Sequence, residues 1–162
     1  MSSHDDVLAA LEDNARYTVE DIARLTETDP DTVETAIADL EESGVIQGYR
    51  VVVDRSRLDE EPVRAAVELN VTLDRETSYD DIAERLARFP MVESLYLVSG
   101  DFDYLMYVEG ESMREVSAFI SDKVAPVPEI TQTVTNYVMD AYKEQGITLG
   151  DGHDDDRLSI SP

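Results

Sequence analysis

The sequence predicts an α+β protein built from two small parts. Two observations support this prediction. Apolar residues recur at helical spacing behind capping residues up to Gly44, and from Val63 onward strand-like and helix-like segments alternate in the order βαββαβ. The chain has 162 residues and no cysteine. It has no apolar run near the roughly 20 residues that a membrane span needs, so a protein of the cytoplasm that is not inserted in a membrane is expected.

Three helices are predicted in the first 44 residues. The first carries an apolar face that begins at Val7, and Thr18, with Asp21 three residues on, caps the second. Asp29 caps the third, Pro30 takes its first position, and Gly44 ends it. Residues 45–54 are expected to form two short strands bent at Gln47-Gly48, which would make a wing. Residues 1–54 are therefore predicted to be a winged helix-turn-helix, a DNA-binding domain.

In such a domain the third helix lies in the major groove and the wing lies beside the phosphate backbone. Thr32 and Thr35 are the candidates for contact with bases, because no basic residue lies on the exposed face of this helix. The basic residues gather after it, and Arg50, Arg55 and Arg57 are the candidates for phosphate contact. The alternative is that these arginines pair with neighbouring acidic residues on the protein surface.

The chain is strongly acidic, with a formal net charge of -24 and only two lysines. This composition resembles that of proteins from the salt-accumulating haloarchaeal cytoplasm, where at 1 M salt the Debye length shrinks to about 3 Å. A DNA mimic or a chain with disordered acidic tails would be the alternatives. At molar salt the repulsion of DNA would be largely screened, so we expect high salt to permit binding rather than abolish it.

Residues 55–62 are predicted to be a polar linker, and residues 63–149 a ferredoxin-like βαββαβ domain. Its helices would cover one face of an antiparallel sheet, and a second copy of the chain would cover the other face. Residues 150–162 are expected to be a flexible acidic tail. This tail could hold a divalent cation loosely, but a solvated tail without a metal is favoured.

The sequence resembles the Lrp/AsnC, or feast/famine, family of transcription regulators, which join a winged helix-turn-helix to a small-molecule-binding domain called RAM. The resemblance spans about residues 5–147, and it is most specific in residues 40–49 and 98–104. It implies a regulator whose oligomerisation or DNA affinity responds to an amino acid or related metabolite. Family members carry basic residues at positions held here by Thr35, Ala36, Ala38 and Asp39.

The resemblance also implies an effector site between RAM domains of adjacent dimers. A loop with a glycine would approach the ligand, and threonines of the last strand would add hydrogen bonds. The residues carried over are Ser99, Gly100, Asp101, Phe102, Asp103, Thr131, Thr133 and Thr135. The alternative is ordinary hairpin chemistry, since Gly-Asp is a common turn pair.

The expected partners are therefore double-stranded DNA, a small-molecule effector and further copies of the chain, as a homodimer and, in the larger assembly, an octamer. A second possibility is a co-regulator that does not bind DNA and assembles with related regulators. An enzyme is not expected, although the family resembles the siroheme decarboxylases, because His4 and His153 both fall in expected tails. No cofactor is expected.

Overall fold

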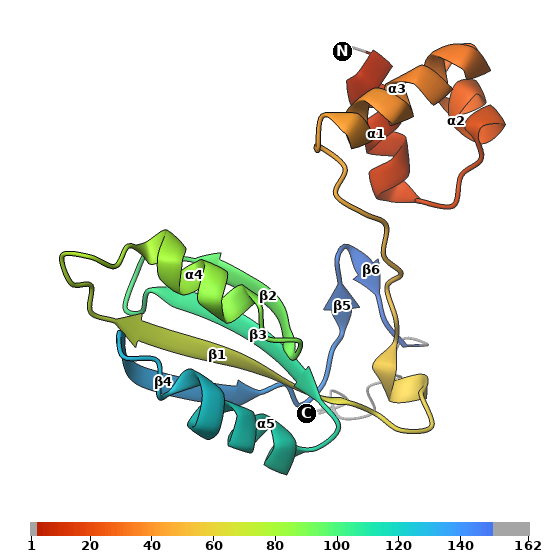
Figure 1. The fold of residues 1–162 in the computed structure, drawn as a ribbon. Coiled ribbons are helices and arrows are strands. Elements are labelled where there is room, and N and C mark those ends of the chain that lie inside the picture. The colour runs from red at the N-terminus through yellow and green to blue at the C-terminus, as the bar shows by residue number, and fades with distance from the viewer. Residues whose placement is uncertain (1–2, 151–162) are drawn as a thin grey trace, which may run out of the picture. The chain divides into compact units, whose positions relative to one another are not determined.

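A computed structural model describes residues 3–150 of the chain. The chain divides into two compact units, with the division between Val52 and Val53 (Figure 1). Of the acidic tail predicted at residues 150–162, residues 151–162 lie outside the described residues. None of the helices between residues 3 and 150 is long and apolar enough to cross a membrane.

The N-terminal unit contains three helices, α1 (Ser3–Asp13), α2 (Val19–Thr26) and α3 (Pro30–Glu42). The predicted caps are confirmed: Thr18 and Asp21 form a capping box, and the side chain of Asp29 accepts from the backbone of Thr32. Gly44 follows α3 with a φ of 74°, in the left-handed region that favours glycine. All three helices contribute apolar residues to the buried core of this unit. These residues are Val7, Leu11, Ile22, Ala23, Val33, Ala36 and Leu40.

The predicted strand pair of the wing is wrong. Residues 45–54 form no strand, although Ile46 donates a backbone hydrogen bond to Leu40 at 3.0 Å. The Tyr49 hydroxyl donates to Glu41 Oε1 at 2.9 Å, and Val51 is 80% exposed. A ribbon this short is marginal unless an apolar face packs against something. The segment therefore follows α3 as an extended chain.

The second unit begins with a short 3-10 turn (Arg55–Arg57) and contains a four-stranded antiparallel sheet. The strands are β1 (Val63–Val71), β2 (Val92–Leu97), β3 (Tyr104–Gly110) and β4 (Ile130–Tyr137), in the order β2-β3-β1-β4. Helix α4 (Tyr79–Ala87) connects β1 to β2. Helix α5 (Met113–Phe119) continues into a π-helical turn (Ile120–Val124) before β4. The predicted ferredoxin-like order is confirmed.

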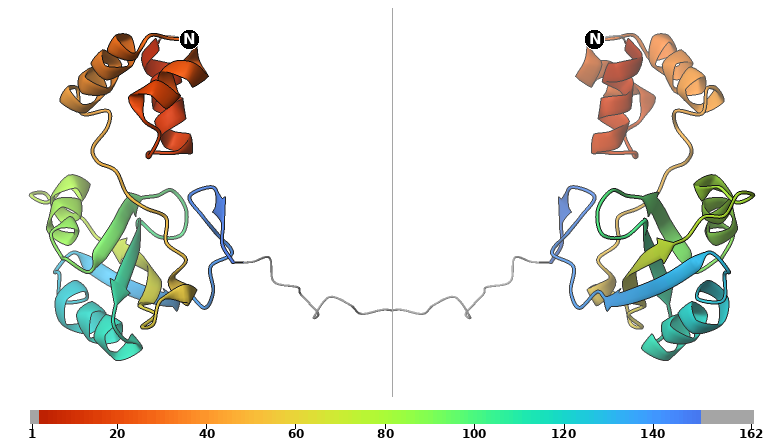
Figure 2. Two further views of the ribbon diagram at one scale, coloured as in Figure 1. Left: turned by 90° about the vertical axis from the view of Figure 1, so that its right-hand side faces the viewer. Right: turned by 90° about the vertical axis from the view of Figure 1, so that its left-hand side faces the viewer.

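The two helices cover one face of this sheet (Figures 1 and 2). Alternate residues of β1 and β3 point into the core beneath them, among them Val67, Leu69, Tyr104 and Met106, each at most 1% exposed. The Tyr104 hydroxyl donates to the backbone oxygen of Tyr79 at 2.6 Å. Burial raises the pKa of Tyr104 to about 12.

The other face of the sheet is uncovered in the single chain. By register it carries Ala66, Tyr96, Leu105, Tyr107 and Val134. Tyr96 is 53% exposed and its ring meets that of Tyr107 edge to face. After β4 the chain makes a small hairpin that the sequence analysis did not predict, with strands β5 (Lys143–Glu144) and β6 (Ile147–Thr148).

Candidate functional sites

The exposed face of α3 is acidic and neutral, as predicted. Its exposed residues include Asp31, Glu34, Thr35, Ala38 and Asp39. Asp39 Oδ2 lies 3.1 Å from His4 Nε2 of α1. Any attraction of this helix to DNA must therefore come from hydrogen bonds and apolar contacts rather than from charge.

Both threonines of α3 already use their hydroxyl hydrogens within the helix. Thr32 Oγ1 donates to the capping residue Asp29 at 2.6 Å, and Thr35 Oγ1 donates to the backbone oxygen of Asp31 at 2.9 Å. Each oxygen keeps the capacity to accept from a base amino group, and each methyl can meet a thymine methyl.

Ala36 does not lie on the exposed face of α3. It is only 1% exposed and lies in the core of the N-terminal unit. A basic side chain at position 36 would therefore lie in the core of this unit and could not reach DNA. The positions of α3 at which a basic side chain could lie in solvent are therefore Thr35, Ala38 and Asp39.

The three candidate arginines are divided between the two units. Arg50 is exposed and belongs to the N-terminal unit, whereas Arg55 and Arg57 belong to the second. Arg55 Nε lies 2.6 Å from Glu109 Oε2 of β3, with both side chains 25% exposed, and Arg57 Nε lies 3.2 Å from Asp54 Oδ2. The pKa of Asp54 is lowered, first by the hydrogen bond from the Ser56 hydroxyl and then by that from Arg57. Arg57 thus pairs with a neighbouring acidic residue, as the alternative expects, whereas Arg55 pairs with a glutamate that is distant in sequence.

The candidate effector loop joins β2 to β3 and is fastened to the end of β1. Asp103 donates its backbone N–H to Leu69 at 2.9 Å, and its carboxylate accepts the N–H of Val71 at 2.8 Å. Asn70 Nδ2 donates to the backbone oxygen of Asp101 at 2.9 Å. The carboxylate of Asp103 therefore supports the loop, while Asp101 remains exposed at its tip.

Two features of this loop suit the approach of a ligand. Gly100 has a φ of 126°, a backbone conformation that other residues rarely adopt, and a Cβ there would meet no atom within 4 Å. Ser99, Gly100 and Asp101 are exposed, whereas Phe102 is half-buried.

The three threonines of β4 do not share one environment. Thr131 lies at a bulge opposite Asn70 and Val71, is exposed, and donates to the backbone oxygen of Asn70 at 3.2 Å. Thr133 and Thr135 pair with Leu69 and Val67, so they lie half-buried on the face that the helices cover. The structure thus brings Thr131, but not the other two, next to the strand end that holds the loop.

Asn70 was not predicted as part of this site. It bonds the loop through its side chain and Thr131 through its backbone oxygen. The sequence around Asn70 does not indicate these hydrogen bonds, because Asp101 and Thr131 are both distant from Asn70 in sequence.

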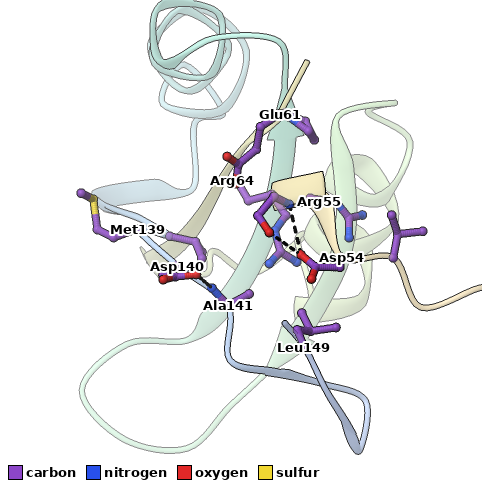
Figure 3. A pocket seen from close by; sticks show the side chains of 12 residues that line it. Asp54, Arg55, Glu61, Arg64, Met139, Asp140, Ala141 and Leu149 are labelled. Carbon is purple, nitrogen blue, oxygen red and sulfur yellow. Dashed lines mark hydrogen bonds between the residues drawn. The ribbon is translucent and has the colours of Figure 1, made fainter. Parts of the chain in front are cut away.

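A separate shallow hollow, open to solvent, lies at the other end of the unit (Figure 3). It is bounded by the chain that leads into β1 and by the chain that follows β4. Its lining includes Asp54, Arg55, Arg64, Met139 and Leu149, and none of the predicted effector residues. Among residues 3–150, no group of three or more His, Asp or Glu side chains is placed to hold a metal ion.

The three-helix unit and the antiparallel sheet with helices on one face each match a known kind of domain. Residues 64–148 match the Lrp/AsnC ligand binding domain, and residues 6–47 match a winged helix-turn-helix DNA-binding domain. The chain belongs to the Lrp/AsnC family.

The relatives give the same result along the whole chain. The chain is 35% identical to the uncharacterized HTH-type transcriptional regulator YugG of Bacillus subtilis, over 97% of this chain and 95% of that protein. It is 30% identical to a proline dehydrogenase transcriptional activator of Rhodobacter capsulatus, over 86% and 90%. The protein is thus a DNA-binding transcription regulator, and the co-regulator alternative is not favoured.

Solved structures share the fold. The structure of AsnC from E. coli superposes with a TM-score of 0.68 at 21% identity, covering 90% of this chain and 95% of that one. The complex of the regulator NMB0573 with L-Met from Neisseria meningitidis superposes with a TM-score of 0.71 at 19% identity, covering 94% and 97%.

Proposed function

We propose that this regulator senses an amino acid or a related small metabolite at the end of the sheet where the β2–β3 loop meets β1. The observation that carries this proposal is the way the loop is held. Asp103 and Asn70 fasten it from behind, which leaves Gly100 and Asp101 presented to solvent. A neighbouring structure in the fold comparison holds L-Met, which makes amino acids the first compounds to test.

The chemistry of the loop suits a zwitterion. The carboxylate of Asp101 would pair with the ligand ammonium, and backbone N–H groups at Ser99 and Gly100 would donate to its carboxylate. Thr131 would add a hydrogen bond. Phe102 and Asp103 would shape and hold the loop. Thr133 and Thr135 would not contact the ligand directly, because their side chains lie on the face of the sheet that the helices cover.

The partner in this proposal is a second copy of the chain, which covers the open face of the sheet. Tyr107 and Val134 are each 38% exposed there, beside polar residues such as Glu68 and Asn136, and a face of this mixed kind is suited to an interface between copies of the chain. Dimers would then join into octamers through the ends that carry the effector loops.

DNA contact in this proposal rests on Thr32 and Thr35 for bases and on Arg50 for phosphates. Arg50, Arg55 and Arg57 would each exchange their present contacts within the protein for contacts with phosphates. The acidic surface fits a haloarchaeal type of regulator working in a salt-rich cytoplasm, where screening allows an acidic protein to approach DNA.

The test of the effector site is a thermal-shift and calorimetric survey of the twenty amino acids. We expect one or a few to stabilise the full chain, and Asp101→Asn to weaken that ligand at least tenfold. Asp59→Asn is the matched control, because Asp59 is an exposed aspartate away from the loop. No ligand among the twenty, or equal affinity in both variants, would refute the site.

The test of DNA regulation is binding to the protein's own upstream region from about 0.1 to 3 M potassium chloride, with and without the amino acid. Specific binding that persists at high salt and shifts with the ligand supports the proposal. Absence of binding at every salt concentration, with the oligomer intact, would instead indicate a co-regulator.

A further inference from the structure

Three large apolar side chains that face solvent lie close together in the chain after β4. Met139 is 91% exposed, Tyr142 is 70% exposed and Ile147 is 52% exposed. Exposed apolar side chains that gather on one part of a protein are typical of a surface that binds another protein. We name residues 138–150, which hold the β5–β6 hairpin, the C-terminal arm (Figure 1).

The arm has a defined backbone shape. Gln145 has a φ of 44° and Gly146 a φ of 86°, and both values are positive, as the type I′ loop of a two-residue hairpin requires. Glu144 of β5 lies opposite Ile147 of β6. The exposed side chains are therefore carried on an ordered turn rather than on an irregular loop.

The arm stands on the open side of the sheet. Arg64 precedes the buried Ala65 in β1, so by alternation it lies on the open face. Arg64 Nη1 lies 3.0 Å from Glu144 Oε2, and Val138 donates its N–H to the backbone oxygen of Arg64 at 2.9 Å. Figure 2 shows the hairpin on the side of the sheet away from α4 and α5. A molecule that covers the open face therefore meets the arm as well.

Ile147 faces this same side. Residues that lie opposite each other in an antiparallel pair point to the same side of the ribbon, so Ile147 shares the side of Glu144. Glu144 reaches Arg64 on the open face, whereas half of the surface of Ile147 is left to solvent. The open face and this side of the arm thus adjoin at the ion pair between Arg64 and Glu144.

The charges of this surface fit a second copy of the chain. The open face carries Glu68, whose carboxylate accepts from the neutral amide of Asn136 at 3.2 Å. Burial of a carboxylate under a partner is favoured only when a cation lies close to it. Lys143, one of only two lysines in the chain, is exposed on the arm and can supply such a cation to the partner. The chain thus presents both an acidic and a basic group on this side, which suits a self-complementary interface between identical chains.

We propose that the C-terminal arm docks on the second copy of the chain in the homodimer, with Tyr142 and Ile147 as its apolar contacts. This inference rests on the proposed function, in which a second copy covers the open face. In a two-fold dimer each arm contacts the other copy, so the arms add two contact regions to the interface between the sheets. An arm that must fit the other copy also favours self-association over pairing with a related regulator.

The experiment uses the absence of cysteine from the chain, because a single introduced cysteine can then be followed without background. Ile147→Cys places it in the arm. Met113→Cys is the matched control, because Met113 is 56% exposed on the helix layer. Each chain is labelled with a maleimide as a dimer and as a monomer, which is obtained by dilution and by adding Val134→Glu on the open face. Sedimentation velocity and circular dichroism verify the oligomer and the fold of each sample.

We expect the cysteine at position 147 to react at least about tenfold more slowly in the dimer than in the monomer, because contact with the partner restricts access to the thiol. The cysteine at position 113 should react equally fast in both. Equal rates at position 147 in dimer and monomer would overturn the inference. If the chain forms no dimer, or if Val134→Glu leaves the dimer intact, the proposed interface fails and the inference fails with it.

A second measurement tests whether the arm contributes to affinity. We expect Tyr142→Ser and Ile147→Ser each to weaken the dimer at least about fivefold, the usual effect of truncating a side chain that matters in an interface. Leu25→Ser and Met113→Ser are the controls, because these side chains are 57% and 56% exposed elsewhere, and they should change the affinity less than about twofold. Equal effects in all four variants would overturn the inference. So would Tyr142→Ser if it kept the dimer and instead weakened DNA binding, because the arm would then dock on DNA.

Discussion

Ser78 is the N-cap residue of helix α4, one of the two helices that cover the sheet. Its hydroxyl accepts from the N–H of Asp81 at 3.2 Å, and its own N–H donates to the Asp81 carboxylate at 2.8 Å. We predict that Ser78→Ala destabilises the protein by about 1 kcal/mol, because it leaves an N-terminal helix donor without its partner. Urea unfolding followed by circular dichroism measures this. Ser117→Ala, at an exposed position within α5, is the control and should change stability by less than about 0.5 kcal/mol.

Asp81 gives the same helix start a dependence on pH. The backbone N–H of Ser78 and then its hydroxyl hold the pKa of Asp81 below its usual value. A lowered pKa in the folded state means that the charged form stabilises the fold above the unfolded pKa of about 3.9, and that this contribution is lost as the pH falls through the folded value. We predict that Asp81→Asn is less stable than the natural chain at pH 7, and that the difference shrinks below about pH 4. A difference that is constant from pH 7 to pH 2.5 would contradict this account.

At the scale of elements, α3 offers a direct test of how an acidic unit reads DNA. Ala38 is exposed in the middle of the helix, so an arginine there would face the groove without disturbing the core. We predict that Ala38→Arg strengthens DNA binding at low salt and makes the slope of log K against log salt more negative by about 0.9, the value for one added phosphate contact. Ala87→Arg on α4 makes the same change of net charge elsewhere. Equal gains from the two variants would show that only overall charge matters.

The open face of the sheet makes a separate prediction about assembly. Val134 lies on this face in the edge strand β4, opposite Glu68 of β1, and we predict that Val134→Glu shifts the oligomer to monomers by burying an unpaired charge in the interface. Sedimentation velocity measures the shift. Met113→Glu is the control, because Met113 is 56% exposed at the start of α5, on the helix layer. If both variants are monomers, or if neither is, the open face of the sheet is not the interface.

The elements show which parts of the structure can be predicted from sequence. The caps at Thr18, Asp29 and Ser78 are local patterns, and their predictions are confirmed. The order of the sheet follows from alternation and from the short connections between elements. The ion pair between Arg55 and Glu109 joins residues 54 positions apart, and no local pattern marks it.

The effector loop shows the same limit. The Gly-Asp pair predicted the turn, but the hydrogen bonds from Asn70 to Asp101 and from Val71 to Asp103 join the end of β1 to a loop about 30 residues later in the chain. The two strands predicted for the wing are absent for a related reason. Val51 and its neighbours have strand propensity, but a strand needs a partner, and none lies beside them within the described part of the chain.

At the scale of the whole molecule, the charge of -24 is the dominant feature. Ion pairs such as Arg85 with Glu129 neutralise few of the 37 acidic residues, so most of them repel one another across the surface. The Debye length falls from about 10 Å at 0.1 M salt to about 3 Å at 1 M, which removes most of this repulsion. Folding and assembly should therefore both be favoured by salt, in contrast to a protein held together mainly by surface ion pairs.

We predict that raising potassium chloride from about 0.1 to 2 M increases the thermal midpoint by at least about 5 °C, which corresponds to about 2 kcal/mol for a chain of this size. Scanning calorimetry at fixed protein concentration measures it. The matched variant replaces four exposed glutamates by glutamine, namely Glu12, Glu42, Glu60 and Glu84. Because it has less repulsion to screen, it should start from a higher midpoint at low salt and gain less on addition of salt. If both chains gain equally, exclusion of the salt from the protein surface, rather than screening of its charges, stabilises this regulator.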